Sequence, residues 1–222
     1  MPAEEGVSEE VIVVVAGGDP PDPISALAVP LGARVIAADS GLDHAFALGL
    51  EVELAIGDFD SASPEAVARA DAGGTRIERH PAEKDATDLE LALDEAVSRG
   101  AERVLVVSGD GGRLDHLLAT LLLLGSSRYA AVEIDACIGR ARAYVIRGER
   151  AIEGQVGELV SLLALHGLAE GVHTDGLAYR LSGETLESGS SRGVSNLFAA
   201  ETARIIVERG TLLAIRPGKT AT

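Results

Sequence analysis

The sequence predicts an α/β fold in which an N-terminal, open, parallel-sheet (Rossmann-like) domain precedes a smaller C-terminal antiparallel β-sandwich domain. Up to about residue 140, apolar β-rich runs alternate with helical patterns, as in a parallel sheet covered by helices on both faces. From about residue 141, short alternating stretches are separated by Gly, Ser and Asn, which is typical of antiparallel strands. We therefore expect one domain over residues 1–140 and a second over residues 141–222.

The strands expected in the first domain have nearly continuous Val, Ile, Leu and Ala content, as strands buried on both faces do. They are Val11–Ala16, Arg34–Ala38, Val52–Ile56, Arg103–Ser108 and Val132–Ile134. Helices are expected between them, at Gly41–Leu48, Pro64–Ala70, Asp88–Arg99 and Asp115–Leu124.

Local signals support these helices. Ser63 is a good N-cap for the second, which begins with proline. Thr87 and Glu90 form a capping box for the third, and Gly100 closes it. The helix Asp115–Leu124 is apolar on nearly all sides, so we expect it to lie deep in the structure.

In the second domain the expected strands are short and the expected turns contain Gly or Ser. The strands are Ala143–Ile146, Glu158–Leu165, Tyr179–Leu181, Thr185–Glu187, Ala203–Glu208 and Thr211–Ile215. The turns are Ser182–Gly183, Ser188–Gly193 and Glu208–Gly210. This pattern predicts antiparallel hairpins.

Composition limits the classes of function. The chain of 222 residues has 19 Lys and Arg against 35 Asp and Glu, a net charge of −16, with few aromatic residues and no Trp. Such a surface repels phosphate backbones, so we expect no nucleic-acid partner. The longest apolar run, Leu117–Gly125, is less than half of the ~20 residues that span a bilayer, so we expect no membrane insertion.

The single cysteine, Cys137, excludes an intrachain disulfide and a multi-cysteine metal site. The N-terminus also lacks the charged and then apolar pattern of a secretory signal. Both observations favour a cytoplasmic location.

Two aspartates follow a predicted strand. Asp58 and Asp60 come just after Ile56, at the carboxyl end of the strand, where open α/β sheets bind their ligands. In an extended backbone both side chains project to one side, and paired carboxylates suit Mg²⁺. The alternative is a solvated turn, because Gly, Asp and Ser are common turn residues.

A second acidic segment contains Lys84, Asp85, Thr87 and Asp88. A capping box with acidic residues at the positive end of a helix explains Thr87 and one aspartate. It leaves the other aspartate and Lys84 unexplained, and Lys84 offers a positive charge for a phosphate. Both interpretations stay open.

A glycine-rich segment enters the fourth predicted helix. Its glycines, Gly111 and Gly112, let backbone N–H groups approach phosphates, which Arg113 can bind with two hydrogen bonds. The segment is neither a dinucleotide fingerprint nor a P-loop, and a tight turn would also explain it. Tyr179 could line a small-molecule pocket or fill the core of the second domain.

Taken together, several segments resemble the thiamine pyrophosphokinase (thiamine diphosphokinase) family across nearly the whole chain. The segments, in order, are Ala38–Gly41, Gly57–Ser61, Lys84–Asp88, Gly111–His116 and Val194–Phe198. The resemblance implies transfer of the diphosphoryl group of ATP to thiamine, giving thiamine diphosphate and AMP, with Mg²⁺ as cofactor. It also implies an ATP-binding first domain, a thiamine-binding second domain, and a homodimer with active sites between subunits.

The resemblance also implies roles for individual residues. The catalytic set would be Asp58, Asp60, Asp85, Thr87 and Asp88, of which Asp58, Asp60 and Asp88 would hold the metal or its waters. The nucleotide side would comprise Asp39, Ser40, Gly41, Lys84, Gly111, Gly112, Arg113, Asp115 and His116. The thiamine side would comprise Tyr179, Ser195 and Asn196.

The sequence departs from the family pattern at two places. Ser40 replaces the first glycine of Ala-Asp-Gly-Gly, and Tyr179 with Arg180 stands where some relatives have Trp-Asn. Other interpretations are a metal-dependent nucleotide-sugar glycosyltransferase, a haloacid-dehalogenase-like phosphatase, and a non-catalytic nucleotide- or thiamine-binding regulator on the same fold. The phosphatase is disfavoured, because its Asp-x-Asp pair normally follows the first strand.

Overall fold

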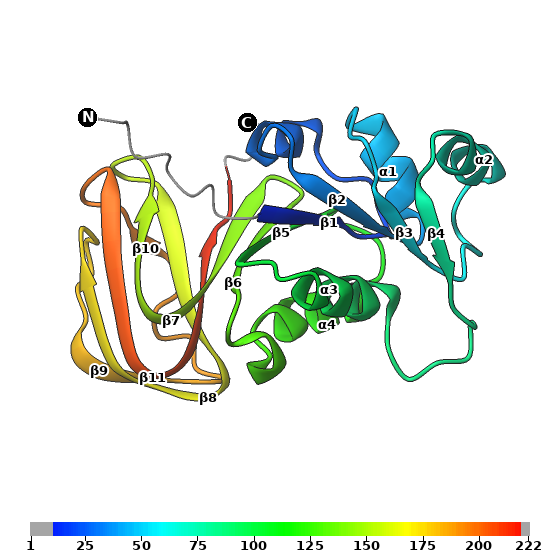
Figure 1. The fold of residues 1–222 in the computed structure, drawn as a ribbon. Helices are drawn as coiled ribbons and strands as arrows, with labels where there is room; N and C mark the ends of the chain where they lie inside the picture. Colours follow the sequence, from blue (N-terminus) through cyan, green and yellow to red (C-terminus); the bar gives the residue numbers. More distant parts are fainter. Residues whose placement is uncertain (1–10, 219–222) are drawn as a thin grey trace, which may run out of the picture.

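The computed structural model describes residues 11–218, and its N-terminal part is built on a parallel sheet (Figure 1). The parallel strands are β1 (Val11–Val15), β2 (Arg34–Ala38), β3 (Leu54–Gly57), β4 (Arg76–Arg79), β5 (Arg103–Ser108) and β6 (Glu133–Ile138). Their order in the sheet is β6-β5-β1-β2-β3-β4. The chain therefore leaves β1 for neighbours on both sides, which creates the kind of crevice where α/β sheets bind ligands.

Helices cover both faces of this sheet (Figure 1). On one face lie α1 (Gly41–Ala47) and α2 (Pro64–Ala72), and on the other lie α3 (Asp88–Ser98) and α4 (Leu114–Leu124). Two short 3₁₀ helices, η1 (Pro23–Ala28) and η2 (Ser127–Tyr129), complete this part. The expected caps are confirmed, because Ser63 accepts a hydrogen bond from the Ala66 N–H and Thr87 accepts one from the Glu90 N–H.

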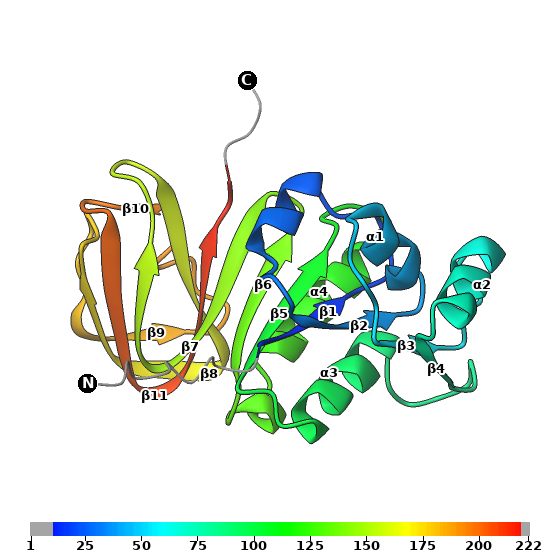
Figure 2. The same ribbon diagram turned by 45° about the horizontal axis from the view of Figure 1, so that its top comes forward.

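The C-terminal part is antiparallel and continues the same sheet. Its strands are β7 (Ala141–Glu153), β8 (Leu159–Asp175), β9 (Ser182–Glu187), β10 (Asn196–Leu197) and β11 (Thr202–Arg216). β7 pairs with β6, and the path then runs through β11 and β8 to β10, with β9 also on β8. These strands fold around a second core that includes Val160, Leu162 and Phe198 (Figure 2). The expected two-part α/β and β-sandwich architecture is confirmed.

Some expected elements were wrong or missing. Tyr179–Leu181 lies outside the strands, and Ser182–Gly183 begins β9 instead of forming a turn. The expected turn at Glu208–Gly210 lies inside β11, where the pairing register shifts between Val207 and Leu212. Gly210 has a φ of 96°, so the turn signal marks an irregularity within one bent strand. β4 was not expected, because it is a short, charged edge strand.

The expectation that the fourth helix lies deep was wrong. In α4, Leu114, Leu118 and Leu122 are 77%, 56% and 40% exposed. The opposite side, with Leu117 and Leu121, packs on the sheet core. Within residues 11–218, α4 is an outer-layer helix with an apolar outer side. No helix in this range is long and apolar enough to cross a bilayer.

Gly41 fixes the approach of α1 to the end of β1. A Cβ at this position would overlap the carbonyl oxygen of Val15 and press on the backbone of Ala16. Glycine therefore allows the loop after β2 to lie directly beside the loop after β1.

We predict that Gly41→Ala lowers the free energy of unfolding by roughly 1–3 kcal/mol, because backbone must move to admit the methyl group. Urea denaturation monitored by circular dichroism would measure the change. Gly73→Ala is the matched control, since Gly73 has a helical backbone and its Cβ would meet only carbonyls of the last turn of α2. Equal stability of the two variants would contradict the packing argument.

Candidate active site

Three carboxylates converge at the carboxyl edge of the parallel sheet. Asp39 follows β2, and Asp58 and Asp60 follow the neighbouring β3. One oxygen from each of the three lies within 4.8 Å of the others. Asp39 was assigned to the nucleotide side from the sequence, but the structure places it in the acidic cluster of Asp39, Asp58 and Asp60.

The backbone around the cluster is turned, so the expectation of an extended Asp-x-Asp segment was wrong. Phe59 has a φ of 61° and its ring is buried, and the Asp60 N–H donates to Asp58 Oδ1 at 3.1 Å. The carboxylates converge because this turn, and not strand alternation, brings them together. Gly57 permits the arrangement, because a Cβ there would lie 3.1 Å from the Asp39 Cα.

The electrostatics of the cluster favour a cation. The charge of Asp58, together with burial and the charges of Asp39 and Asp88, raises the pKa of Asp60. The backbone N–H of Asp60 is the main cause that lowers the pKa of Asp58, with help from Lys84. Asp39 Oδ1 is buried and has no hydrogen-bond partner among residues 11–218. Converging hard oxygen ligands with one unsatisfied acceptor fit Mg²⁺.

Lys84 lies between the cluster and Asp88. Its ammonium nitrogen is 3.6 Å from Asp58 Oδ2 and 3.0 Å from Asp88 Oδ1, and it also donates to the Pro81 carbonyl at 3.1 Å. Burial lowers the pKa of Lys84, but the hydrogen bond and charge of Asp88 and the charge of Asp58 outweigh this effect and raise it. Of the expected metal ligands, Asp58 and Asp60 therefore share a cluster, while Asp88 faces them across Lys84.

The remaining residues of this segment differ in their placement. The Thr87 hydroxyl caps α3, so its structural role is confirmed by the hydrogen bond from Glu90. Asp85 is exposed in the loop before α3. Both lie within three residues of Lys84, and among the described residues neither side chain forms a hydrogen bond or ion pair with the acidic cluster.

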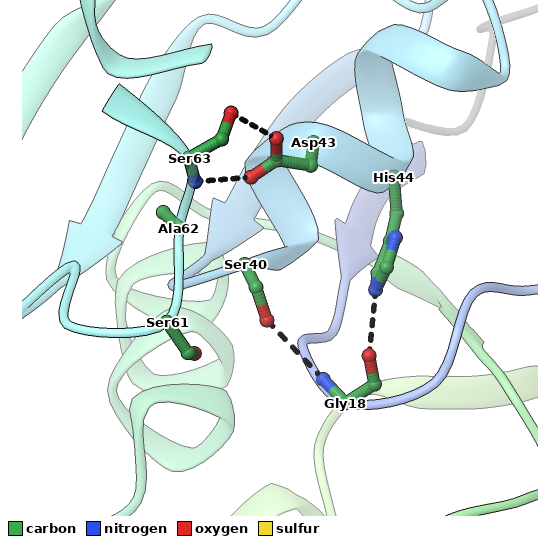
Figure 3. Close-up of a pocket in the computed structure, with 7 residues that line it drawn as sticks. All are labelled: Gly18, Ser40, Asp43, His44, Ser61, Ala62 and Ser63. Carbon is green, nitrogen blue, oxygen red and sulfur yellow. Dashed lines mark hydrogen bonds between the residues drawn. The ribbon is translucent and has the colours of Figure 1, made fainter. Parts of the chain in front are cut away.

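An open pocket of about 400 Å³ is lined by residues of the loops around α1 (Figure 3), and one of them, Ser61, contacts the cluster. The Ser61 hydroxyl, on its wall, donates to Asp39. The Gly18 N–H donates to Ser40 Oγ at 3.3 Å, and His44 Nε2 lies 2.9 Å from the Gly18 carbonyl oxygen. The pocket is lined by Gly18, Ser40, Asp43, His44, Ser61, Ala62 and Ser63.

Asp43 fixes the loop that carries the metal-binding candidates. Its carboxylate accepts hydrogen bonds from both the N–H and the hydroxyl of Ser63, the N-cap of α2 (Figure 3). No role was expected for Asp43 or His44 from the sequence, and Ser61 belonged to a motif without a role of its own. Their closeness in sequence to the motifs was the available signal. Asp43 and His44 lie in the helix that begins at Gly41, and Ser61 follows Asp60 directly.

The glycine-rich loop after β5 packs against the loop after β1. A Cβ on Gly109 would clash with the Asp19 carbonyl oxygen, so glycine is needed there for the two loops to meet. At Gly111 and Gly112 a Cβ would meet the Asp19 carboxylate, which is the end of a movable side chain. The expected nucleotide residues Arg113 and Asp115 form an exposed ion pair at 2.6 Å, which lowers the pKa of Asp115 to about 2. His116 is exposed beside them.

The residues expected to contact thiamine are organised by Asn196. This side chain is buried, accepts hydrogen bonds from the N–H groups of Tyr179 and Leu197, and donates to the Tyr179 carbonyl at 2.7 Å. The Tyr179 side chain is 66% exposed. Ser195 has a φ of 60° and donates its N–H to Ser161 Oγ. Asn196 thus holds the Tyr179 backbone and leaves its ring free.

Within one described chain, the expected thiamine side and the acidic cluster lie far apart. β10, which contains Asn196, lies at one end of the sheet path, and β3, which leads to Asp58, lies near the other. Figures 1 and 2 both show β10 in the sandwich, far from β3.

Comparison with known proteins gives matches over both parts of the chain. Residues 32–136 match the family description "Thiamin pyrophosphokinase, catalytic domain", and residues 145–212 match "Thiamin pyrophosphokinase, vitamin B1 binding domain". A curated thiamine pyrophosphokinase of Bacillus subtilis (strain 168) is 35% identical over 89 residues, which are 40% of this chain and 42% of the relative. That match thus spans about two fifths of the relative's length.

Solved structures match along nearly the whole chain. A thiamin pyrophosphokinase family protein from Enterococcus faecalis is 29% identical with a TM-score of 0.77, covering 96% of this chain and 100% of that one. A thiamin pyrophosphokinase from Geobacillus thermodenitrificans is 27% identical with a TM-score of 0.78, covering 95% and 99%. The thiamine pyrophosphokinase structure from Bacillus subtilis, 24% identical with a TM-score of 0.82 and covering 95% and 100%, shares the fold.

These matches agree with the resemblance of the motifs and do not favour the glycosyltransferase, phosphatase or regulator interpretations. The two family descriptions together match well over half of the chain, in the order in which its two structural parts occur. The chain belongs to the thiamin pyrophosphokinase family.

Proposed function

We propose that this protein is a thiamine diphosphokinase, which transfers the β,γ-diphosphoryl group of ATP to the hydroxyl of thiamine and releases AMP. The observation that carries the proposal is the convergence of Asp39, Asp58 and Asp60 at the carboxyl edge of the sheet, in a chain of this family. In nucleotide sites Mg²⁺ is usually held by one or two carboxylates together with the phosphates and water, and this cluster can supply those carboxylates.

The chain's own residues would act mainly by positioning and by electrostatics, as is general for phosphoryl transfer. The acidic cluster would hold Mg²⁺, which when bound neutralises charge on the polyphosphate. Asp88 and Lys84 border the same space. The thiamine hydroxyl would attack the β-phosphorus in line with the departing AMP, and Asp85 or Asp88 would accept its proton.

The open pocket around α1 and the glycine-rich loop are the proposed nucleotide side. A volume of about 400 Å³ falls within the range of small-molecule sites. On this side we place Ser40, Gly41, Lys84, Gly111, Gly112, Arg113, Asp115 and His116, while Asp39 belongs to the acidic cluster. The exposed Arg113 guanidinium is available for a phosphate if it leaves Asp115.

We further propose that the active enzyme is a homodimer. Tyr179 is held by Asn196 of β10, and Asp58 follows β3, far along the sheet path from β10, so a site that uses both needs a second copy. The exposed leucines of α4 are an apolar stripe of the kind that a subunit interface covers. This stripe adjoins the glycine-rich loop, which lies directly before α4.

We predict that the purified protein forms AMP and thiamine diphosphate together when it is given ATP, Mg²⁺ and thiamine. Chromatographic separation of both products tests this prediction. AMP formation that does not depend on thiamine would point to another acceptor and reject the proposed function.

In the same assay, Asp58→Asn should lower kcat by more than about a hundredfold, because a metal-held polyphosphate contributes several kcal/mol. Asp88→Asn should show a loss in the same direction. The exposed Asp71→Asn on α2 is the matched control and should keep normal activity. Near-native activity of Asp58→Asn at saturating Mg²⁺ would reject the metal assignment.

Tyr179→Ala should raise the thiamine KM about two- to thirtyfold, because a ring face against the thiazolium cation contributes roughly 0.5–2 kcal/mol. Tyr179→Phe keeps the ring and should retain most of the affinity. Steady-state kinetics at saturating ATP measures both. An unchanged KM in Tyr179→Ala would remove this residue from the thiamine side.

Leu118→Glu should convert the dimer to a monomer and lower thiamine-dependent AMP formation, since a charge in the centre of a buried apolar stripe is costly. Light scattering coupled to size-exclusion chromatography measures the mass. Val156→Glu, at an apolar position that is 67% exposed between β7 and β8, is the control and should stay dimeric. A dimeric Leu118→Glu variant would show that the interface lies elsewhere.

A further inference from the structure

The ammonium of Lys84 lies between the carboxylates of Asp58 and Asp88 and offsets their negative charges. It is 3.0 Å from Asp88 Oδ1 and 3.6 Å from Asp58 Oδ2, and its side chain is only 15% exposed. Asp88 Oδ1 is a buried atom, and among the described residues its ion pair with Lys84 is the contact that compensates its charge.

The neighbouring charges make this compensation important. Asp39, Asp58 and Asp60 converge within 4.8 Å, and Asp88 lies across Lys84 from Asp58. Arg79, the cation next to Phe59, stacks over the ring of that residue at 5.0 Å. Within residues 11–218, Lys84 is therefore the cation that forms ion pairs with carboxylates of this group.

We propose that Lys84 is a resident counter-cation that holds Asp58 and Asp88 together before the metal binds and that a divalent cation must displace. The proposal builds on the metal site of the proposed function. Asp58 Oδ2 has two possible cationic partners, Lys84 and a metal, and repulsion between them opposes simultaneous contact. Lys84 consequently weakens metal binding to the nucleotide-free protein.

Displacement gives Lys84 a second position without any large movement of the chain. Lys84 lies in the loop before α3, and the ion pair with Asp88 joins residues one helical turn apart. A lysine has a flexible stem and a point charge, so it can leave Asp58 and turn toward a phosphate bound beside the metal. Lys84 would thus neutralise carboxylate charge in the metal-free protein and phosphate charge in the protein with metal and nucleotide bound.

The test measures Mn²⁺ binding to nucleotide-free protein by electron paramagnetic resonance, which needs no turnover. Lys84→Met should bind Mn²⁺ at least about fivefold more tightly than wild type, because a competing positive charge has been removed from the site. Lys84→Arg keeps the charge and should stay within about twofold of wild type. Arg79→Met removes a neighbouring cation that contacts the Phe59 ring instead of a carboxylate. Its Mn²⁺ affinity should also stay within about twofold of wild type.

Thermal unfolding gives a second readout. In EDTA, Lys84→Met should melt at a lower temperature than wild type, since its carboxylates lack compensation, and added Mn²⁺ should raise its Tm more than it raises that of wild type. Should Lys84→Met fold poorly, Lys84→Gln is measured in the same way. Equal or weaker Mn²⁺ binding in the folded neutral variant would overturn the proposal.

Activity separates this proposal from the proposed function. A wild-type protein that forms thiamine diphosphate, with Lys84→Met binding Mn²⁺ no more tightly, would keep the function and reject the counter-cation. Tighter Mn²⁺ binding by Lys84→Met in a protein that forms no thiamine diphosphate would reject the function and keep the counter-cation.

Discussion

Repulsion among carboxylates at the carboxyl edge of the sheet is the constraint around which this site is built. Asp39, Asp58 and Asp60 converge, and the raised pKa of Asp60 expresses the cost of bringing them together. The protein offsets part of that cost with the Asp60 N–H and the Lys84 ammonium, both of which lower the pKa of Asp58. The repulsion that remains between the carboxylates favours binding of a divalent cation.

Holding these charges in place requires a rigid frame, and neighbouring loops supply it. Asp43 holds Ser63, Ser61 holds Asp39, and Ser40 holds Gly18, so the loops after β1, β2 and β3 are tied to one another. Glycines let these loops approach, as at Gly41 against Val15. The frame continues to β5 through the contact of Asp19 with the glycine-rich loop.

Much of this arrangement was predictable from local patterns. Continuous Val and Ile runs identified β1, β2 and β5, and capping signals at Ser63 and Thr87 identified where α2 and α3 begin. The motif residues Asp58, Asp60, Lys84 and Asp88 were selected from the sequence, and the structure brings their side chains close together. What failed was the inference from apolar character to depth in α4, because an apolar surface can be covered by another subunit as well as by the chain itself.

The sequence by itself determined the fold class, the carboxyl-edge position of the acidic motifs and the family, because strand periodicity, caps and motif order are local properties of the chain. Only the tertiary structure decided which charges meet. It placed Asp39 with Asp58 and Asp60, set Lys84 between Asp58 and Asp88, and used Asn196 to hold the Tyr179 backbone. These contacts depend on how neighbouring loops turn and on long-range hydrogen bonds, which spacing along the chain does not specify.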